Sequence, residues 1–300
     1  MSSQPTQTAQ EKLPGFENLP ARVIHTIDLA ALNEKYRLRM VPVAESIDFL
    51  RCLFYGRQGV GKTYLAASSG QVPEMAPILL LQTDKGTMSI ASFPNVSVQT
   101  ITNVAELRRI VTMVKDPTNP FKTVVVDDLL EFYNMLMVGR LKEEGMKPGH
   151  DPNVPQMQDW LNVTFLTRAL LRAFKDLPVN LIVTTTAQFA TDEQLQVINR
   201  LPAMPGKMAW EVGKWFDVVG YLTTGGSQQK ITRTLQVQPY RNTEAKDRTG
   251  KLGANIAEPT MQIIYDAAFR GRPPVQAQVD EETIRANVDA ALSTEPKESL

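Results

Sequence analysis

The stretch FYGRQGVGKTYLA, residues 54–66, carries three glycines within six residues, followed by a lysine and a threonine. Glycines let the backbone turn tightly and direct successive N–H groups inward, where they can bind an anion. The apolar run before the turn, residues 50–55, predicts a buried strand, and residues 63–69 after it predict a helix. A strand, a glycine-rich turn and a helix in this order indicate a phosphate-binding loop.

The turn matches the pattern G-x-x-x-x-G-K-[ST] at every position. In this pattern Lys62 reaches the β- and γ-phosphates of a nucleotide, and the hydroxyl of Thr63 coordinates Mg²⁺. We therefore expect ATP and Mg²⁺ as ligands. The predicted nucleotide-binding residues are Gly56, Arg57, Gln58, Gly59, Val60, Gly61, Lys62, Thr63 and Tyr64.

A phosphate loop that binds Mg²⁺ also needs a carboxylate, because Mg²⁺ prefers oxygen ligands. The apolar run at residues 123–126 predicts a buried strand, and it ends on Asp127 and Asp128. We assign Asp127 to the metal, together with Thr63. Asp128 competes for that role and also suits the cap of the helix that follows.

Hydrolysis further requires a group that orients or activates water. Asp84 follows the continuous apolar run at residues 78–82, which predicts a strand buried on both faces. Its carboxylate either reaches a water beside the γ-phosphate or lies exposed in the turn before Gly86. Asp128 is the second candidate for the catalytic role.

Strands and helices alternate along most of the chain. Further helices are predicted at residues 29–37, 104–114, 129–141 and 163–174, and further strands at 180–186, 217–223 and 231–238. This alternation predicts an α/β fold with a mainly parallel central sheet flanked by helices. The last two strands have little sequence between them, so we expect antiparallel strands at one edge.

Composition excludes several classes of protein. The 32 basic and 32 acidic side chains balance, so no global field directs the chain to nucleic acid or to a membrane. The one cysteine, Cys52, rules out a disulfide framework, and its apolar neighbours predict a buried thiol. The sequence has neither a membrane-spanning apolar run of ~20 residues nor a signal-peptide core. We expect a cytoplasmic protein with no membrane partner.

The phosphate loop, the carboxylate after the second strand and Asp127 together resemble the RecA-like ATPase core. Three later stretches are LPAMPGK at 201–207, WFDVV at 215–219 and AKDRTG at 245–250. They resemble phage nucleotide-binding proteins of the AAA-type ATPase domain class, which include RecA-like single-strand annealing proteins. The resemblance spans about residues 48–255.

Composition and this resemblance together suggest three parts: an N-terminal extension at 1–45 that is partly disordered, a RecA-like P-loop NTPase core at 46–272, and an acidic tail at 273–300. Residues 280–300 carry six acidic and two basic side chains. The tail is either a solvated terminus or a contact for a partner such as a single-strand DNA-binding protein.

The resemblance also implies roles for single residues. Relatives carry an acidic residue, usually Glu, at the position of Asp84, and the shorter Asp implies slow hydrolysis. Lys246 and Arg248 match a Lys-x-Arg pair that a neighbouring subunit supplies to the γ-phosphate; the alternative is a solvated loop. Gln188 matches a polar sensor of the γ-phosphate. These roles imply a homo-oligomer, either a ring or a filament.

RecA-like relatives bind DNA through two loops, which correspond here to residues 143–155 and 188–209. The second contains Phe189, Arg200 and Lys207, and neither loop is strongly basic. DNA binding is therefore implied by the resemblance rather than by charge.

The sequence supports an ATP- and Mg²⁺-dependent phage DNA recombination protein, an ATPase that binds single-stranded DNA and promotes annealing or strand pairing. Its location would then be the bacterial host cytoplasm. The alternative is a nucleotide-dependent accessory ATPase or switch that acts on a protein partner in phage replication or packaging. A small-molecule kinase is a third class that uses phosphate loops. No arginine-rich lid is evident in the sequence, but Lys246 and Arg248 could imitate one, so this alternative stays open.

Overall fold

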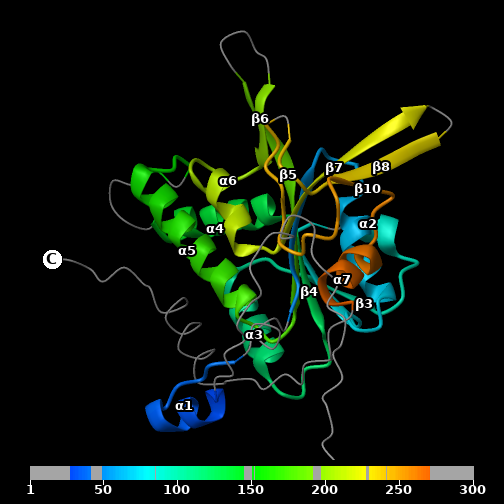
Figure 1. Ribbon diagram of the computed structural model, residues 1–300. Coiled ribbons are helices and arrows are strands. Elements are labelled where there is room, and N and C mark those ends of the chain that lie inside the picture. The colour runs from blue at the N-terminus through cyan, green and yellow to red at the C-terminus, as the bar shows by residue number, and fades with distance from the viewer. Residues whose placement is uncertain are drawn as a thin grey trace, which may run out of the picture. The chain divides into compact units, whose positions relative to one another are not determined.

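The structure is a computed structural model of the chain (Figure 1). It describes residues 28–41, 49–84, 86–144, 151, 153–191, 197–227, 230–240 and 242–270. The chain divides into two compact units, Met1–Ser46 and Ile47–Leu300. In the first unit, α1 (Leu29–Tyr36) is capped by Asp28, whose side chain accepts a hydrogen bond from the N–H of Ala31. The predicted domain boundaries stay predictions, and the acidic tail lies outside the described residues.

The second unit is built on a ten-stranded sheet in the order β10-β8-β7-β1-β5-β4-β2-β3, with β6 paired to β5 and β9 to β7. Its strands are β1 (Arg51–Gly56), β2 (Ile78–Gln82), β3 (Val96–Thr100), β4 (Thr123–Asp127), β5 (Asn180–Thr191), β6 (Val197–Pro202), β7 (Val218–Ser227), β8 (Lys230–Gln236), β9 (Lys246–Asp247) and β10 (Asn255–Ala257). The strands from β7 to β3 pair in parallel, whereas β8 and β10 are antiparallel. The predicted α/β fold, with antiparallel strands at one edge, is confirmed.

Helices cover both faces of this sheet (Figure 1). They are α2 (Lys62–Ala67), α3 (Val104–Lys115), α4 (Leu129–Glu144), α5 (Met157–Lys175), α6 (Met208–Glu211) and α7 (Met261–Phe269), with short 3₁₀ turns η2 (Ser68–Gln71), η3 (Thr87–Ile90) and η4 (Val212–Trp215). One hydrophobic cluster packs α3 to α6 on one face, and a second packs α2 and α7 on the other. No helix among the described residues is long and apolar enough to cross a bilayer.

The central strand β1 is buried on both faces from Cys52 to Tyr55, which explains the apolar and aromatic residues at these positions. Leu53 and Tyr55 point into the first cluster, while Cys52 and Phe54 point into the second. Successive side chains of a strand alternate between faces, so the run before the phosphate loop contributes to both cores. Cys52 is a free, fully buried thiol, as predicted, and burial raises its pKa.

The region at 188–209 differs from the loop that the sequence suggested. β5 continues past residue 186 to Thr191 and turns back into β6, and α6 follows. The two strands project beyond the helices (Figure 1). The apolar signal stops at residue 186 because later residues of β5 leave the core and are only half-buried. The edge strand β3 was missed for the same reason, since its side chains are mostly exposed.

The amino ends of three strands are joined by one buried side chain. The Asn180 side chain at the start of β5 accepts a hydrogen bond from the N–H of Leu50 at 2.9 Å. Its amide also donates to the carbonyl oxygen of Lys122 at 3.0 Å. Asn180 thereby links the segments that enter β1 and β4, and its loss leaves a buried N–H without a partner.

We predict that Asn180→Ala lowers the free energy of unfolding by about 1–3 kcal/mol, the cost of unpaired buried polar groups. Urea denaturation followed by circular dichroism measures the change. Asn134→Ala, at an exposed position of α4, is the matched control and should stay within ~0.5 kcal/mol of the wild type. Equal stability of the two variants would contradict the role of Asn180.

Candidate functional site

The phosphate loop joins the carboxyl end of β1 to α2, and two of its glycines are required by geometry. A Cβ at Gly56 would collide with the carbonyl oxygen of Leu222 on the neighbouring strand β7. Gly61 has φ +98°, a conformation that side chains of L-residues rarely adopt. The loop therefore holds its shape only with glycine at these positions.

Lys62 is folded into this loop. Its Nζ donates to the carbonyl oxygens of Gly56 and Arg57, both at 3.2 Å. Burial lowers the pKa of Lys62, and the nearby carboxylates of Asp128 and Asp127 act against that shift. The ammonium group thus lies inside the turn, where the sequence pattern predicts contact with phosphate.

The hydroxyl of Thr63 donates to Oδ2 of Asp127 at 2.6 Å, which brings the two predicted metal residues together. The other carboxylate oxygen accepts a hydrogen bond from the hydroxyl of Thr184. Thr184 lies on β5, which is inserted between β1 and β4. The sequence analysis missed Thr184, although the Thr-Thr-Thr run at 184–186, at the end of an apolar strand, was an available signal.

Asp128 points to a different set of donors. Its Oδ1 accepts from the N–H of Leu130 at 2.8 Å and from the hydroxyl of Thr185 at 3.3 Å. Its Oδ2 accepts from the hydroxyl of Thr186 at 3.1 Å. Asp128 therefore caps α4, and burial raises the pKa of its carboxyl group. The geometry places Asp127, rather than Asp128, against Thr63.

The donor set suits Mg²⁺ that shares its ligands with a nucleotide. The described residues contain no cluster of three or more His, Cys, Asp or Glu side chains able to hold a metal by themselves. Mg²⁺ in nucleotide sites is commonly held by one or two protein groups plus phosphate oxygens and water. Thr63 and Asp127 supply oxygen atoms of that kind beside the loop.

Two other predicted residues lie near the carboxyl ends of parallel strands, one just after β2 and one on β5. Asp84 is exposed and follows β2, whose last residue, Gln82, pairs with Asp127 on β4. Gln188 is half-buried on β5 and follows Thr184 and Thr186 at strand spacing, on the same face. Their predicted catalytic and sensor roles stay predictions.

Lys246 and Arg248 lie away from the phosphate loop of their own chain. Lys246 pairs with Val219 near the start of β7, and its Nζ donates to the carbonyl oxygen of Gly213 at 3.0 Å. Arg248 forms an ion pair with Asp217 at 3.3 Å. Burial, followed by the charge of Arg248, lowers the pKa of Lys246. Their role toward a neighbouring subunit stays a prediction.

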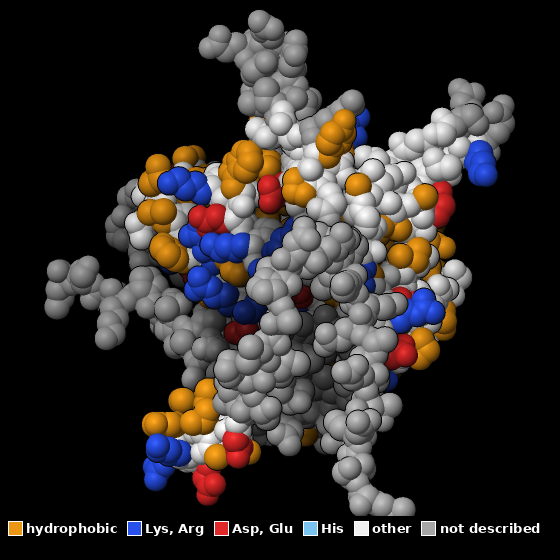
Figure 2. All heavy atoms as spheres, in the orientation of Figure 1, with side chains coloured by type: hydrophobic (Ala, Val, Ile, Leu, Met, Phe, Trp, Pro, Cys, Tyr) orange, Lys and Arg blue, Asp and Glu red, His pale blue; other side chains and the backbone are white. Residues whose placement is uncertain are grey.

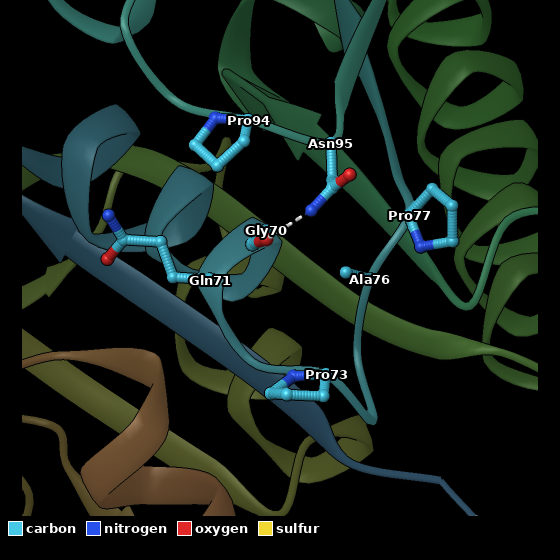
Figure 3. A pocket seen from close by; sticks show the side chains of 7 residues that line it. All are labelled: Gly70, Gln71, Pro73, Ala76, Pro77, Pro94 and Asn95. Atoms are coloured by element: carbon cyan, nitrogen blue, oxygen red, sulfur yellow. Dashed lines mark hydrogen bonds between the residues drawn. The ribbon is translucent and has the colours of Figure 1, made fainter.

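A hollow of about 630 Å³ lies away from the phosphate loop, at the ends of the sheet where β2 and β3 begin (Figure 3). Its lining includes Gly70, Pro77 and Asn95, the last two directly before β2 and β3. The side-chain amide of Asn95 donates to the carbonyl oxygen of Gly70 at 3.2 Å. None of the described residues that line the hollow is charged, so these residues do not supply the groups that would bind phosphate.

The loop, its lysine and the threonine–aspartate pair define a P-loop NTPase. The family model described as an AAA domain matches residues 48–249, more than half of the chain. The chain belongs to this AAA-domain family.

Three solved structures are similar to this chain at low sequence identity. The KaiC-like protein PH0186 from Pyrococcus horikoshii OT3 is 14% identical, with a TM-score of 0.39, covering 70% of this chain and 89% of that one. The flagellar accessory protein FlaH from Methanocaldococcus jannaschii is 9% identical, with a TM-score of 0.35, and the match covers 71% of this chain and 87% of that one. The RadB recombinase is 17% identical, with a TM-score of 0.37 and coverages of 64% and 82%. No curated protein matches the chain.

We predict that Asp127→Asn lowers the affinity for ATP in the presence of Mg²⁺ by about tenfold or more, because groups that orient metal ligands have effects of this size. Affinity in EDTA should change little, since Lys62 and the loop are intact. Isothermal titration calorimetry with Mg²⁺ and with EDTA separates the metal-dependent part of the ATP affinity from the part that the loop supplies alone. Glu74→Gln, which removes an exposed carboxylate, is the control. An equal loss in both conditions would argue against a metal role.

Proposed function

We propose that this protein is an ATP- and Mg²⁺-dependent ATPase of phage DNA recombination, which binds single-stranded DNA and promotes annealing or strand pairing. The observation that carries the nucleotide part is the carboxylate of Asp127, bonded to both Thr63 and Thr184 beside Lys62 in the loop. The DNA-binding part of the proposal is supported by β5, which leads from this carboxylate into a hairpin with β6. It is also supported by the resemblance of the stretches at 201–207, 215–219 and 245–250 to phage nucleotide-binding proteins.

The protein residues have separate tasks in this reaction. Bound Mg²⁺ would neutralise charge on the β- and γ-phosphates. Lys62 leaves the loop carbonyls and places its ammonium group against the same phosphates. Thr63 and Asp127 supply oxygen atoms to the metal, directly or through water, and Thr184 keeps the Asp127 carboxylate oriented.

Asp128 is the group that orients the attacking water in this proposal. Three donors fix its carboxylate, and its Oδ2 accepts from only one of them, Thr186. Among the described residues no second donor reaches Oδ2, which leaves one acceptor position for a water molecule. Burial raises the pKa of Asp128, which makes it a stronger base than an ordinary aspartate. Asp84 is exposed, and within the described part of the chain no hydrogen bond fixes its carboxylate.

We predict that Asp128→Asn reduces the ATPase turnover number by about 100-fold, a typical contribution of a general base. Asn keeps an acceptor for the N–H of Leu130, so α4 stays capped. Asp84→Asn should change turnover by less than ~3-fold. In the wild type, the rate should fall with decreasing pH, starting above the ordinary aspartate pKa, because the raised pKa of Asp128 leaves the base protonated there. A phosphate-release assay measures both; if Asp84→Asn were the inactive variant, the roles would be reversed.

One continuous strand connects the nucleotide site to a projecting hairpin. β5 carries Thr184 beside Asp127 and then extends to Thr191, where it pairs with β6. The guanidinium carbon of Arg57, in the phosphate loop, lies 5.3 Å from the ring centroid of Phe189 on β5. A change in the loop or in the Asp127 contacts therefore acts directly on the base of this hairpin.

The hairpin carries the chemistry for a single-stranded nucleic acid. Aromatic rings stack on bases irrespective of sequence, and basic side chains hold the phosphate backbone. Phe189 is half-buried at the base of the hairpin, and Arg200 lies on the paired strand β6. Lys207 is exposed just beyond β6. Nucleotide binding would set the position of Phe189 through its contact with Arg57.

We predict that Phe189→Ala weakens binding of a fluorescent 30-base single strand by ~5-fold or more in the presence of Mg²⁺ and ATP, the range for one base–aromatic stack. Lys62→Ala should abolish the ATP-dependent part of binding. Anisotropy titrations at two salt concentrations measure both effects. Phe165→Ala, at a 63% exposed phenylalanine on α5, is the matched control.

One observation favours a second candidate, a nucleotide-dependent switch that acts on a protein partner. Figure 2 shows hydrophobic side chains exposed over α5 and α6. On α5 these include Met157, Leu161 and Phe165, spaced four residues apart along one face. Such a stripe suits a contact with protein, either a further copy in a ring or filament or another partner. Intact ATP binding without DNA binding in any titration would select this candidate.

A further inference from the structure

Arg233 is a cation beside the phosphate loop that the roles above leave unused. It lies on β8, and the sheet order β8-β7-β1-β5-β4 places it on the side of β1 opposite to Asp127. The sequence analysis had no reason to select it, because Arg233 is 170 residues from Thr63 along the chain.

The side chain of Arg233 is packed against the loop. A Cβ at Gly61 would lie 2.8 Å from its Nε, so the glycine leaves the room that the guanidinium group occupies. The guanidinium carbon is 5.8 Å from the ring centroid of Tyr64. Tyr64 itself is 47% exposed and meets Phe93 edge-on, with centroids 4.9 Å apart. Gly61, Tyr64 and Arg233 thus pack together on one side of the phosphate loop.

The guanidinium group of Arg233 forms no ion pair with another described residue. Its Nε is buried and has no hydrogen-bond partner there. Glu258 directly follows β10, the strand paired with β8. Its carboxylate accepts a hydrogen bond from the backbone N–H of Arg233 at 2.9 Å, and this bond does not involve the side chain of Arg233. A partly buried cation without a partner is costly, so this arrangement is suited to an anionic ligand.

We propose that Arg233 binds the nucleotide in cis, at the α-phosphate. This inference rests on the proposed nucleotide-binding function. Thr63 and Asp127 would hold the metal, and with it the terminal phosphates, on the side of β5 and β4. The nucleoside half of the ligand then extends toward β7 and β8, where the fork of Arg233 reaches the first phosphate while its plane stacks on Tyr64.

The position of Arg233 makes a specific prediction about ligand discrimination. A residue at the α-phosphate contributes equally to ADP and ATP binding, whereas a sensor of the γ-phosphate contributes to ATP alone. Arginine is also specific here, because a lysine has neither the planar fork nor the face that stacks on an aromatic ring. Arg233→Lys should therefore recover only part of the affinity.

The test is isothermal titration calorimetry of the full chain with Mg²⁺–ADP and with a slowly hydrolysed ATP analogue. We expect Arg233→Gln to weaken both ligands by about tenfold or more and by the same factor, as for loss of a charge-assisted hydrogen bond. Arg233→Lys should lie between this variant and the wild type. Lys230→Gln, which removes an exposed cation from the same strand, should bind like the wild type.

Two results would overturn the assignment of Arg233: unchanged affinity for both ligands, or a loss confined to the ATP analogue. Thermal denaturation without ligand checks that each variant is folded. If the wild type bound neither nucleotide, the proposed function would fail and the role of Arg233 with it. Binding by the wild type and by Arg233→Gln with equal affinity would remove only the Arg233 proposal.

Discussion

The carboxylate of Asp127 is the point on which the site depends, because it accepts hydroxyl hydrogen bonds from two different segments. Thr63 follows the phosphate loop, and Thr184 lies in the middle of β5. Since β5 separates β1 from β4, the carboxylate cannot be fixed by the loop strand alone. The orientation of the carboxylate therefore depends on the positions of both the loop and β5. A ligand that moved Asp127 would change its hydrogen bonds to both segments.

The hairpin at the end of β5 is fastened to the loop strand on its other side as well. The hydroxyl group of Tyr55, one residue before the loop, bonds to the carbonyl oxygens of Arg200 at 3.0 Å and Glu244 at 2.6 Å. Burial raises the pKa of this phenol, so it stays a neutral donor. Both strands of the hairpin are thus tied to the segment around the phosphate loop, β5 through Thr184, Asp127 and Thr63, and β6 through Tyr55 at the carboxyl end of β1.

The sequence predicted what is encoded locally and missed what depends on strand order. The loop follows from glycine spacing, and β1, β2 and β4 follow from continuous apolar runs. Thr184 and Arg233 belong to the site only because β5 and β8 lie where they do in the sheet, and no spacing along the chain encodes that. The hairpin was read as a loop because its half-buried residues lack a strong apolar pattern.

Strand register also limits what Lys246 can do. Gly56, at the loop, pairs with Leu222, whereas Lys246 pairs with Val219 on the same strand. Three residues of a strand span about 10 Å, and the ammonium group is already turned toward the carbonyl oxygen of Gly213. The lysine therefore lies toward the ends where the parallel strands begin, while the phosphate loop lies at the carboxyl ends of these strands, where a bound nucleotide would place its phosphates. Any contact of Lys246 and Arg248 with a γ-phosphate must then be made to another copy of the chain, which makes assembly a condition of that role.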